Sequence, residues 1–468
     1  MADSWEVVIG MEVHAQPRTR SKMFCGCAVA PLNSPPNTHV CAVCLGLPGV
    51  LPVINKAAVE ACLKTALALN CEIPIHTKFD RKNYMYPDLP KGYQISQYDL
   101  PMSVNGHLEI EGRKVRIRRV HLEEDTGKLI HAGDKLHKAW ESFVDLNRAG
   151  VPLMEIVSEP DIHSADEARD YAVALRTLLR TIGASEAEME KGQLRAEPNI
   201  SVRRTGAKEL GVKTELKNIN SFRALHRAIE YEVKRQTGVL ESGGSVKQET
   251  RGWSEAEQRT FSQRSKELAE DYRYFPEPDL PPLQLDRKWI EELQRSLPEL
   301  PEARRARLVA QYALPQADAV LLAADRQLAD LFEAAVAKGA PAKATANWII
   351  GEPSAREMSP VYLAELVKLV SDGKINRDQG REVLAEALSS GKAPHVIVSA
   401  RGFAQESDSA TLETIVREVI SANPQAVSDY QAGKKQALGA LMADLKKKAP
   451  QANPKLANEL LQKLLGSG

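Results

Sequence analysis

Near its start the chain carries a stretch that decides the fold of its first part, Trp5-Glu-Val-Val-Ile-Gly-Met-Glu-Val-His-Ala-Gln16. Its odd positions are all apolar, whereas its even positions include Glu12 and His14. Successive side chains of a β-strand point to opposite faces, so this period of two predicts a strand with one apolar face. Glu12 and His14 are then expected on the polar face.

Strand-like and helical segments alternate over the first part of the chain. Residues 114–117 again have a period of two, with basic residues on one face. A capping box formed by Ser164 and Glu167 opens a helix that Gly183 ends, and residues 221–237 predict a second helix. This mixture predicts an α+β domain around a largely antiparallel sheet.

The composition and the expected secondary structure change after a proline-rich segment. Its prolines at positions 276, 278, 281 and 282 exclude regular structure there. Helical, alanine-rich sequence follows, and a polar run after Gly402 precedes a smaller helical unit. We therefore predict three domains: residues 1–290, an all-α domain at 291–405 and a small all-α tail at 406–468.

Composition excludes several classes of protein. The 468 residues include 62 Lys and Arg and 62 Asp and Glu, so the chain is neither a basic nucleic-acid coat nor an acidic disordered tail. No signal-peptide pattern is present, and the uncharged residues 28–55 contain five prolines and are no membrane helix. We expect a cytoplasmic protein, in which cysteines stay reduced.

Four of the six cysteines form two close pairs. Cys25 and Cys27 are separated from Cys41 and Cys44 by thirteen residues. Two such pairs can place four thiolates tetrahedrally around one Zn²⁺, and the closed set predicts a structural rather than a catalytic site. The alternative is a chance group of buried cysteines.

Acidic residues recur beside predicted strands. Glu123, Glu124 and Asp125 precede a Thr-Gly pair, and Glu155 lies within the apolar run Pro152-Leu-Met-Glu-Ile-Val-Ser158. An unpaired buried carboxylate is costly, so Glu155 requires a cation or a basic partner. With Glu12 and His14 these carboxylates suit Mg²⁺ or Mn²⁺ holding a nucleotide phosphate, although simple ion pairs explain them equally well.

A dense polar segment spans residues 80–97 and includes Lys82, Tyr84 and Lys91. It is too irregular for a helix and too rich in donors for a linker, which favours a functional loop. The sequence has neither the G-x-x-x-x-G-K-[ST] nor the G-x-G-x-x-G phosphate loop, so a bound nucleotide would be held in another way.

The tail has an asymmetric charge. Residues 431–468 hold seven lysines against two acidic residues, and Leu441, Leu445, Leu460 and Leu461 belong to two apolar stripes at helical spacing. The lysines are consistent with a solvated helix face and equally with contacts to nucleic-acid phosphates.

Taken together, the motifs resemble one family closely, the B subunits of bacterial aspartyl/glutamyl-tRNA(Asn/Gln) amidotransferases. The resemblance covers essentially the whole chain. The segments that carry it are residues 8–14, 80–97, 122–128, 145–150, 155–161, 215–222 and 271–279.

The resemblance implies a fold and a reaction. The first domain would be a cradle of the glutamine-synthetase/guanido-kinase type, and the tail would contact tRNA. The subunit would act in a heterotrimer with an amidase A subunit and a small C subunit. It would use ATP to phosphorylate the side-chain carboxylate of Glu-tRNA(Gln) or Asp-tRNA(Asn), and ammonia from the A subunit would then displace the phosphate.

It also implies roles for individual residues. His14, Glu124 and Glu155 would bind Mg²⁺, with Glu12 near a second cation, and Glu12 and Glu124 would be catalytic. Lys82 and Tyr84 would lie where ammonia arrives. The departures from the family are Glu197, where the family often has Asp, and a shorter stretch between residues 347 and 360.

Two other readings compete with this one. The chain could be a non-catalytic, zinc-stabilised scaffold that binds tRNA for a catalytic partner. It could also be a glutamine-synthetase-like ligase of a free small molecule, but the lysine-rich tail would then have no role.

Overall fold

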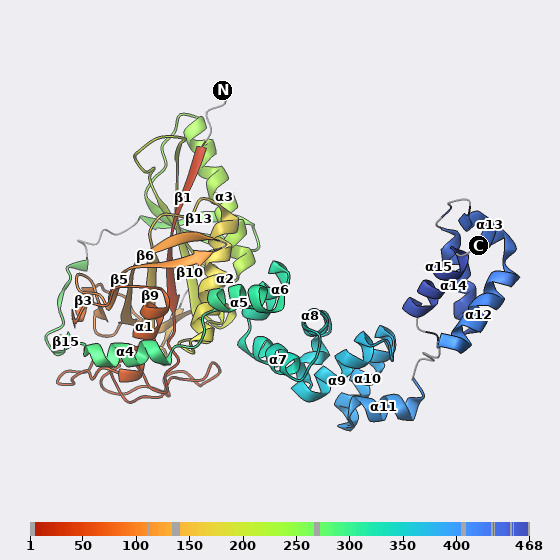
Figure 1. The fold of residues 1–468 in the computed structure, drawn as a ribbon. Coiled ribbons are helices and arrows are strands. Elements are labelled where there is room, and N and C mark those ends of the chain that lie inside the picture. Colours follow the sequence, from red (N-terminus) through yellow and green to blue (C-terminus); the bar gives the residue numbers. More distant parts are fainter. Residues whose placement is uncertain are drawn as a thin grey trace. The chain divides into compact units, whose positions relative to one another are not determined.

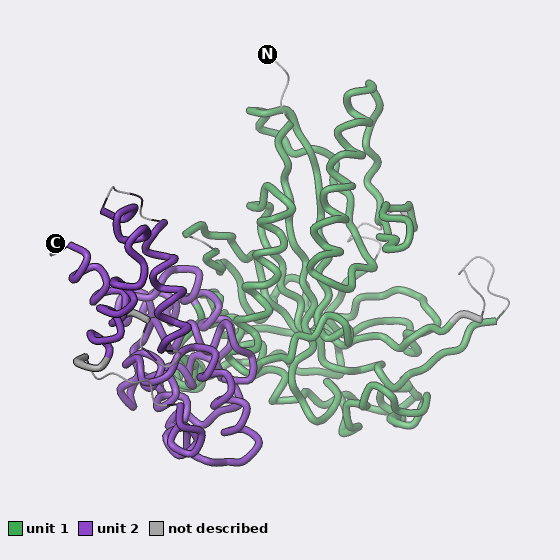
Figure 2. The backbone as a smooth tube through the Cα atoms, turned by 90° about the vertical axis from the view of Figure 1, so that its right-hand side faces the viewer, with its two compact units in different colours: residues 1–301 green, residues 302–468 purple. Residues whose placement is uncertain are grey.

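The computed structural model describes residues 5–110, 112–132, 141–265, 272–403, 409–431, 434, 436–449, 452 and 454–466. Two compact units divide the chain, residues 1–301 and 302–468 (Figure 2). The three-domain division at 290 and 405 stays a prediction, and the second of its boundaries falls outside the described residues.

A large mixed sheet forms the centre of the first unit (Figure 1). Eight strands pair in the order β13-β12-β11-β10-β1-β9-β6-β5, and only the β11–β12 pair is parallel. Their bounds are β1 Trp5–Ala15, β5 Ser103–Ile110, β6 Arg113–Glu124, β9 Pro152–Ser158, β10 Leu194–Arg204, β11 Thr214–Lys217, β12 Glu249–Ser254 and β13 Arg259–Ser265.

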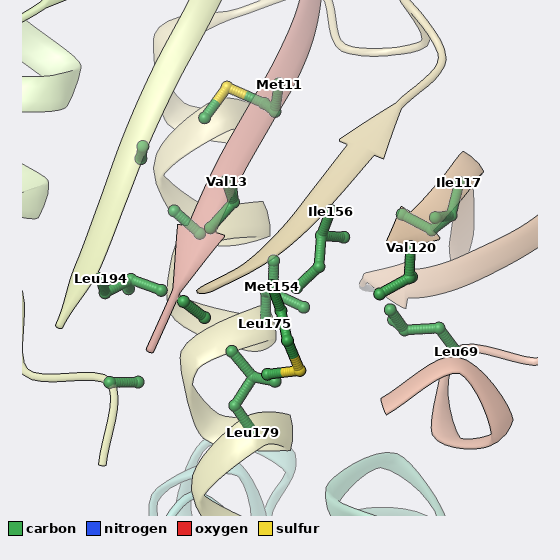
Figure 3. Close-up of a cluster of buried hydrophobic side chains, with 14 of the residues drawn as sticks. Met11, Val13, Leu69, Ile117, Val120, Met154, Ile156, Leu175, Leu179 and Leu194 are labelled. Atoms are coloured by element: carbon green, nitrogen blue, oxygen red, sulfur yellow. The ribbon is translucent and has the colours of Figure 1, made fainter. Parts of the chain in front are cut away.

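Helices cover one face of this sheet. Helix α1 (Lys56–Ala68) packs on β5 and β6, α2 (Ala165–Thr181) on β1, β5 and β10, and α3 (Phe222–Glu241) on β10. The core between the layers includes Met11 and Val13 of β1 and Leu175 and Leu179 of α2 (Figure 3). Each such side chain contributes about 1.5–3 kcal/mol on burial, so the apolar face of β1 is fixed against the helices.

The predicted helices form, with one change at an end. The side chain of Ser164 accepts a hydrogen bond from the Glu167 N–H and caps α2 as expected. Helix α3, however, continues through Gly238 to Glu241. The chain turns instead at Gly243, whose φ of 77° is the left-handed conformation that glycine adopts freely.

Short strands lie outside the large sheet. Residues 80–97, expected as a loop, contain the hairpin β3–β4, which joins β14 in a three-stranded sheet. The small strands are β2 His76–Thr77, β3 Asp80–Asn83, β4 Tyr93–Ser96, β7 Lys128–Ala132, β8 Glu141–Asp145, β14 Phe275–Pro276 and β15 Leu283–Gln284.

The first unit also contains α4 (Arg287–Ser296) and a 3-10 turn, η2 (Met189–Lys191), and α5 begins at its last residue. The second unit is helical in its described part. Its elements are α5 Pro301–Tyr312, α6 Gln316–Ala323, α7 Arg326–Ala337, α8 Ala342–Gly351, η4 Pro353–Glu357, α9 Pro360–Ser371, α10 Arg377–Ser390, α11 Pro394–Arg401, α12 Ser409–Ala422, α13 Pro424–Gln431, α14 Ala437–Lys448 and α15 Pro454–Leu465.

Two separate hydrophobic clusters lie within these helices. One joins buried residues between Leu308 and Val398, and the other joins buried residues between Leu412 and Leu465. The second includes Leu441, Leu445, Leu460 and Leu461 from the two predicted stripes. Every helix among the described residues is too short or too polar to span a bilayer.

Candidate active site

The face of the sheet opposite the helices carries the charged residues that the period of two placed there. The Nε2 atom of His14 lies 3.6 Å from Glu155 Oε2, 3.7 Å from Glu123 Oε1 and 3.8 Å from Glu12 Oε1. Glu123 and Glu155 are buried, with 3% and 7% exposure. Three carboxylates from three strands therefore surround one imidazole.

Strand register explains this convergence. On neighbouring strands, directly opposite residues share a face of the sheet. His14 of β1 is paired with Glu155 of β9, and Glu155 is paired in turn with His121 of β6. His121 Nε2 lies 3.4 Å from Glu155 Oε2. Glu155 thus receives an imidazole from each side, which meets the need of a buried carboxylate for a cationic partner.

Both histidines keep an unused ring nitrogen. The Nδ1 atoms of His14 and His121 are buried and have no hydrogen-bond partner among the described residues. Sequence analysis did not single out His121. The signal was present, since His121 and Glu123 alternate with the apolar Val120 and Leu122.

A second acidic group lies beside the first. Glu12 faces Glu197 across the β1–β10 pair, and Glu215 of β11 completes the group. Lys217 Nζ lies 2.5 Å from Glu197 Oε2 and 3.6 Å from Glu215 Oε1. The longer side chain at position 197 is accommodated by this ion pair, which gives Glu197 a definite place at the edge of the site.

The crowding of carboxylates changes their protonation. Burial, together with the charges of Glu155 and Glu197, raises the pKa of Glu12 to about 7. Burial lowers the pKa of His14, but Glu155, Glu197 and Glu123 outweigh it and raise that pKa to about 9. Burial raises the pKa of Glu155, but His121 and His14 outweigh this effect and hold that pKa well below its usual range. The site therefore attracts cations strongly.

Lys82 and a set of tyrosines lie on the other side of the same space. Lys82 Nζ lies 4.9 Å from the centre of the Tyr272 ring and 6.0 Å from that of Tyr84. Burial lowers the pKa of Lys82, but the charges of Glu123 and Glu155 outweigh it and raise the pKa above its ordinary value. Lys82 is thus held as an ammonium ion that faces the carboxylates.

These residues line one cavity of about 670 Å³. Ligand pockets usually have volumes of about 300–1,000 Å³, so a nucleotide or the acceptor end of a larger substrate can enter. Glu12, His14, Lys82, Tyr84 and Glu155 all line it. The start of the predicted segment 271–279, Asp271, lies outside the described residues.

Glu124, expected among the metal ligands, lies apart from this group in the structure. Its carboxylate pairs with Lys91 Nζ and accepts a hydrogen bond of 3.0 Å from the Ile95 N–H. Among the described residues, Glu124 belongs to no group of possible metal ligands, whereas Glu123 does. The reason is the strand geometry: neighbouring residues on β6 point to opposite faces of the sheet. Glu123 points to the same face as His121, and Glu124 to the other.

Among the described residues, three sets of histidine and carboxylate side chains could hold divalent ions. The ligand atoms in each set lie within 4.8 Å of one another, a spacing that fits oxygen and nitrogen ligands around one ion of about 2.0–2.2 Å bond length. The sets are Glu12, His14 and Glu155; His121, Glu123 and Glu155; and Glu12, Glu197 and Glu215.

The four predicted cysteines also come together. The Sγ atoms of Cys25, Cys27, Cys41 and Cys44 lie within 4.8 Å of one another, and those of Cys41 and Cys44 are 3.9 Å apart. Tetrahedral zinc with bonds of about 2.3 Å requires sulfurs about 3.8 Å apart. The fully buried Lys22 places its Nζ 3.5 Å from Cys44 Sγ, where a positive charge offsets that of thiolates.

The site combines two features of an enzyme that handles anionic groups: clustered carboxylates for cations, and basic side chains on the walls of the same cavity. Comparison with known proteins agrees with this class. Residues 7–291 match the GatB/GatE catalytic domain, and residues 330–465 match the GatB domain.

Similar proteins are aspartyl/glutamyl-tRNA(Asn/Gln) amidotransferase B subunits. That of Moorella thermoacetica is 51% identical over 98% of this chain and 100% of its own length. That of Carboxydothermus hydrogenoformans is 50% identical over 98% of both chains, and that of Thermomicrobium roseum is 50% identical over 98% of this chain and 99% of its own. The chain belongs to this family of amidotransferase B subunits.

Proposed function

We propose that the cavity between the large sheet and the Lys82 segment catalyses ATP-dependent amidation of Glu-tRNA(Gln) or Asp-tRNA(Asn). The observation that carries the proposal is the convergence of Glu12, Glu123 and Glu155 on His14, with Lys82 held as a cation facing them. A scaffold that only binds tRNA would have no use for this costly cluster of buried charge.

The reaction follows from the chemistry of a carboxylate. Ammonia cannot expel an oxide ion, so the oxygen must first become a good leaving group. A side-chain carboxylate oxygen attacks the γ-phosphorus of ATP, the bond to the β-phosphate oxygen breaks, and ADP leaves with the electron pair. Ammonia then attacks the carbonyl carbon of the acyl phosphate. The C–O bond breaks, inorganic phosphate leaves, and the nitrogen loses a proton to give the amide.

Phosphoryl transfer requires positioning and neutralisation of charge more than covalent help. We propose that His14, Glu12, Glu123 and Glu155 hold Mg²⁺, and that Glu197 and Glu215 hold a second cation with Glu12. Bound Mg²⁺ supplies the positive charge that phosphate oxygens require in transfer. The position of His14 Nε2 among the carboxylates and the spacing of the ligand atoms support this assignment.

The protein's own groups have separate tasks. Lys82 offers a positive charge toward the carboxylates, and we propose that it and Tyr84 guide ammonia toward the reacting carbonyl. The rings of Tyr272 and Tyr84 meet edge to face beside the ammonium of Lys82, an arrangement that also suits the passage of ammonia or ammonium. Glu124 has a structural task here, since it secures Lys91 beside β4.

The wider assembly extends the proposal. We propose that the first unit is a cradle of the glutamine-synthetase/guanido-kinase type, that Zn²⁺ binds the four cysteines as a structural ion, and that the lysine-rich tail contacts tRNA. An amidase A subunit and a small C subunit would complete a heterotrimer that acts in the cytoplasm, where aminoacyl-tRNA is used.

An amidation assay tests the function. The complex of A, B and C subunits should convert mis-acylated tRNA to Gln-tRNA or Asn-tRNA only when ATP is present, and ADP should form in step with the amide. A scaffold role predicts that E155Q keeps this activity, whereas the proposed role predicts near-complete loss while tRNA still binds. Activity retained by E155Q would reject the proposal.

A further inference from the structure

Three arginines follow one another along β6, and two of them are fully engaged. Arg116 donates from Nε and Nη2 to Asp161 at 2.8 and 2.6 Å, and Arg118 donates from Nε and Nη2 to Glu159 at 2.9 Å each. Such two-point pairing saturates the side of a guanidinium that recognises planar or tetrahedral anions. Neither group is available for a ligand without breaking its pair.

Arg119 differs from its two neighbours. It lines the cavity, as Arg118 does, but its contact with a carboxylate joins Nη2 to Glu155 Oε1 at 3.6 Å, beyond hydrogen-bond length. Its Nε is buried and has no hydrogen-bond partner in the described part of the chain. A buried donor without an acceptor is unfavourable, and a bound anion would supply the missing acceptor.

Arg119 follows a β-bulge in β6 and faces the same side of the sheet as His121 and Glu123. The pairing of β6 with β9 shifts between Ile117 and Arg119, so that Arg118 is an additional residue. A bulge bends the strand and redirects the side chains beside it. The buried positions of β6 change accordingly, from Val115 and Ile117 before the bulge to Val120 and Leu122 after it.

The other basic groups of the cavity leave a role open. Lys217 is paired with Glu197 and Arg118 with Glu159, and Lys82 lies among tyrosine rings. Arginine is the side chain that binds two oxygens of one phosphate group through two parallel N–H bonds. We propose that Arg119 is a catalytic residue that donates from Nε and one Nη to two non-bridging oxygens of the γ-phosphoryl group during its transfer.

This assignment rests on the proposed function, because it takes phosphoryl transfer as the reaction of the cavity. It differs from a purely structural role. If Arg119 only balanced the charge of Glu155, a lysine at this position would serve as well. If it binds two phosphoryl oxygens, a lysine cannot replace the two parallel N–H donors of the guanidinium group.

The test uses the full complex with ATP and mis-acylated tRNA, and it compares R119K, R119Q and R119A with wild type. R116Q is the matched control, since Arg116 lies on the same strand and is paired outside the cavity. We expect R119K and R119Q to lower kcat for ADP formation by at least about 100-fold, as removal of one transition-state donor does. KM for aminoacyl-tRNA should change little, because the contact forms mainly in the transition state.

Two further readouts separate catalysis from structure. Added guanidinium ion should restore part of the kcat of R119A and none of it in R119Q. Retention of ADP by the complex with aluminium fluoride, which imitates the phosphoryl group in flight, should be strong in wild type and R116Q and weak in R119K.

The outcomes are distinct. If either R119K or R119Q keeps the wild-type kcat, the role of Arg119 is overturned. The proposed function is not affected by that result. Absence of ATP-dependent amidation in wild type overturns the proposed function itself. If R119Q does not assemble with its partners, R119K, which keeps the charge beside Glu155, decides the question.

Discussion

Glu123 and Glu124 are adjacent in the sequence but face opposite sides of β6, so replacing each by glutamine should have opposite consequences. E123Q removes a buried charge that lies 3.7 Å from His14, a residue that lines the cavity. E124Q removes the partner of Lys91 on the other side, where Glu124 lines a small pocket with Cys25 and Cys44 and belongs to none of the carboxylate sets. The pair of variants therefore separates activity from stability with changes of equal size.

The expected loss of stability in E124Q follows from burial. The side chains of Glu124 and Lys91 are 3% and 13% exposed, and breaking a buried ion pair costs about 3–5 kcal/mol. The glutamine amide oxygen can still accept a hydrogen bond from the Ile95 N–H. We therefore expect the free energy of unfolding to fall by about 3 kcal/mol. For a unit of this size about 2 °C is lost per kcal/mol, which gives a Tm lower by about 6 °C.

E123Q should behave in the opposite way. Loss of a charged group that serves the transition state lowers kcat by about 10²–10³-fold, or about 3–4 kcal/mol in activation free energy. Its Tm should change less than that of E124Q, because removing one carboxylate relieves repulsion from Glu155 while it weakens the contacts to His14 and Ser96.

Two measurements decide the matter. Thermal unfolding of the purified chain gives Tm, and ADP formation by the assembled complex gives kcat below the unfolding temperature of both variants. E124Q should keep kcat within about threefold of wild type, since it touches no group of the cavity. The reasoning fails if E124Q loses activity about 100-fold at unchanged Tm, or if E123Q remains fully active.

Three further predictions concern other parts of the molecule. Metal analysis should find about one zinc per chain, and C44S should lose the zinc and unfold at lower temperature; four free thiols in a metal-free wild-type protein would contradict this. K82M should lower glutamine-driven amidation by at least about 10-fold and amidation with added ammonium salt by less, whereas equal losses would argue against a role in guiding ammonia. Removal of residues 406–468 should weaken tRNA binding and flatten its salt dependence with little change in kcat at saturating tRNA, because the lysines of the tail would no longer contact phosphates; unchanged affinity in a filter-binding titration would refute the tail's role.

The polar face of the site could be predicted from the sequence as far as the period of two extends. In β1 the alternation is regular, so Glu12 and His14 were assigned to one face, and both line the cavity. In β6 the apolar positions are odd up to Ile117 and even from Val120 onward. Such a switch from odd to even apolar positions indicates a bulge. Counting from Val120 onward places Glu123, and not Glu124, on the polar face with His121.

Other features depend on contacts between distant segments. The hairpin in residues 80–97 was expected as a loop because its prolines and glycine obscure two strands of only four residues each. Their pairing with β14, nearly two hundred residues away, is invisible in local sequence. The role of Glu197 could likewise be seen only once Lys217 lay beside it.

The bulge in β6 has a consequence for how this strand could have arisen. If Arg118 were absent, Val115 and Ile117 would continue in regular alternation with the present Val120 and Leu122, and His121 and Glu123 would keep their side of the sheet. The additional residue is thus neutral for core packing. A regular ancestral strand could have gained it by insertion of a single codon, acquiring a second arginine at the rim of an already assembled pocket without disturbing the interior.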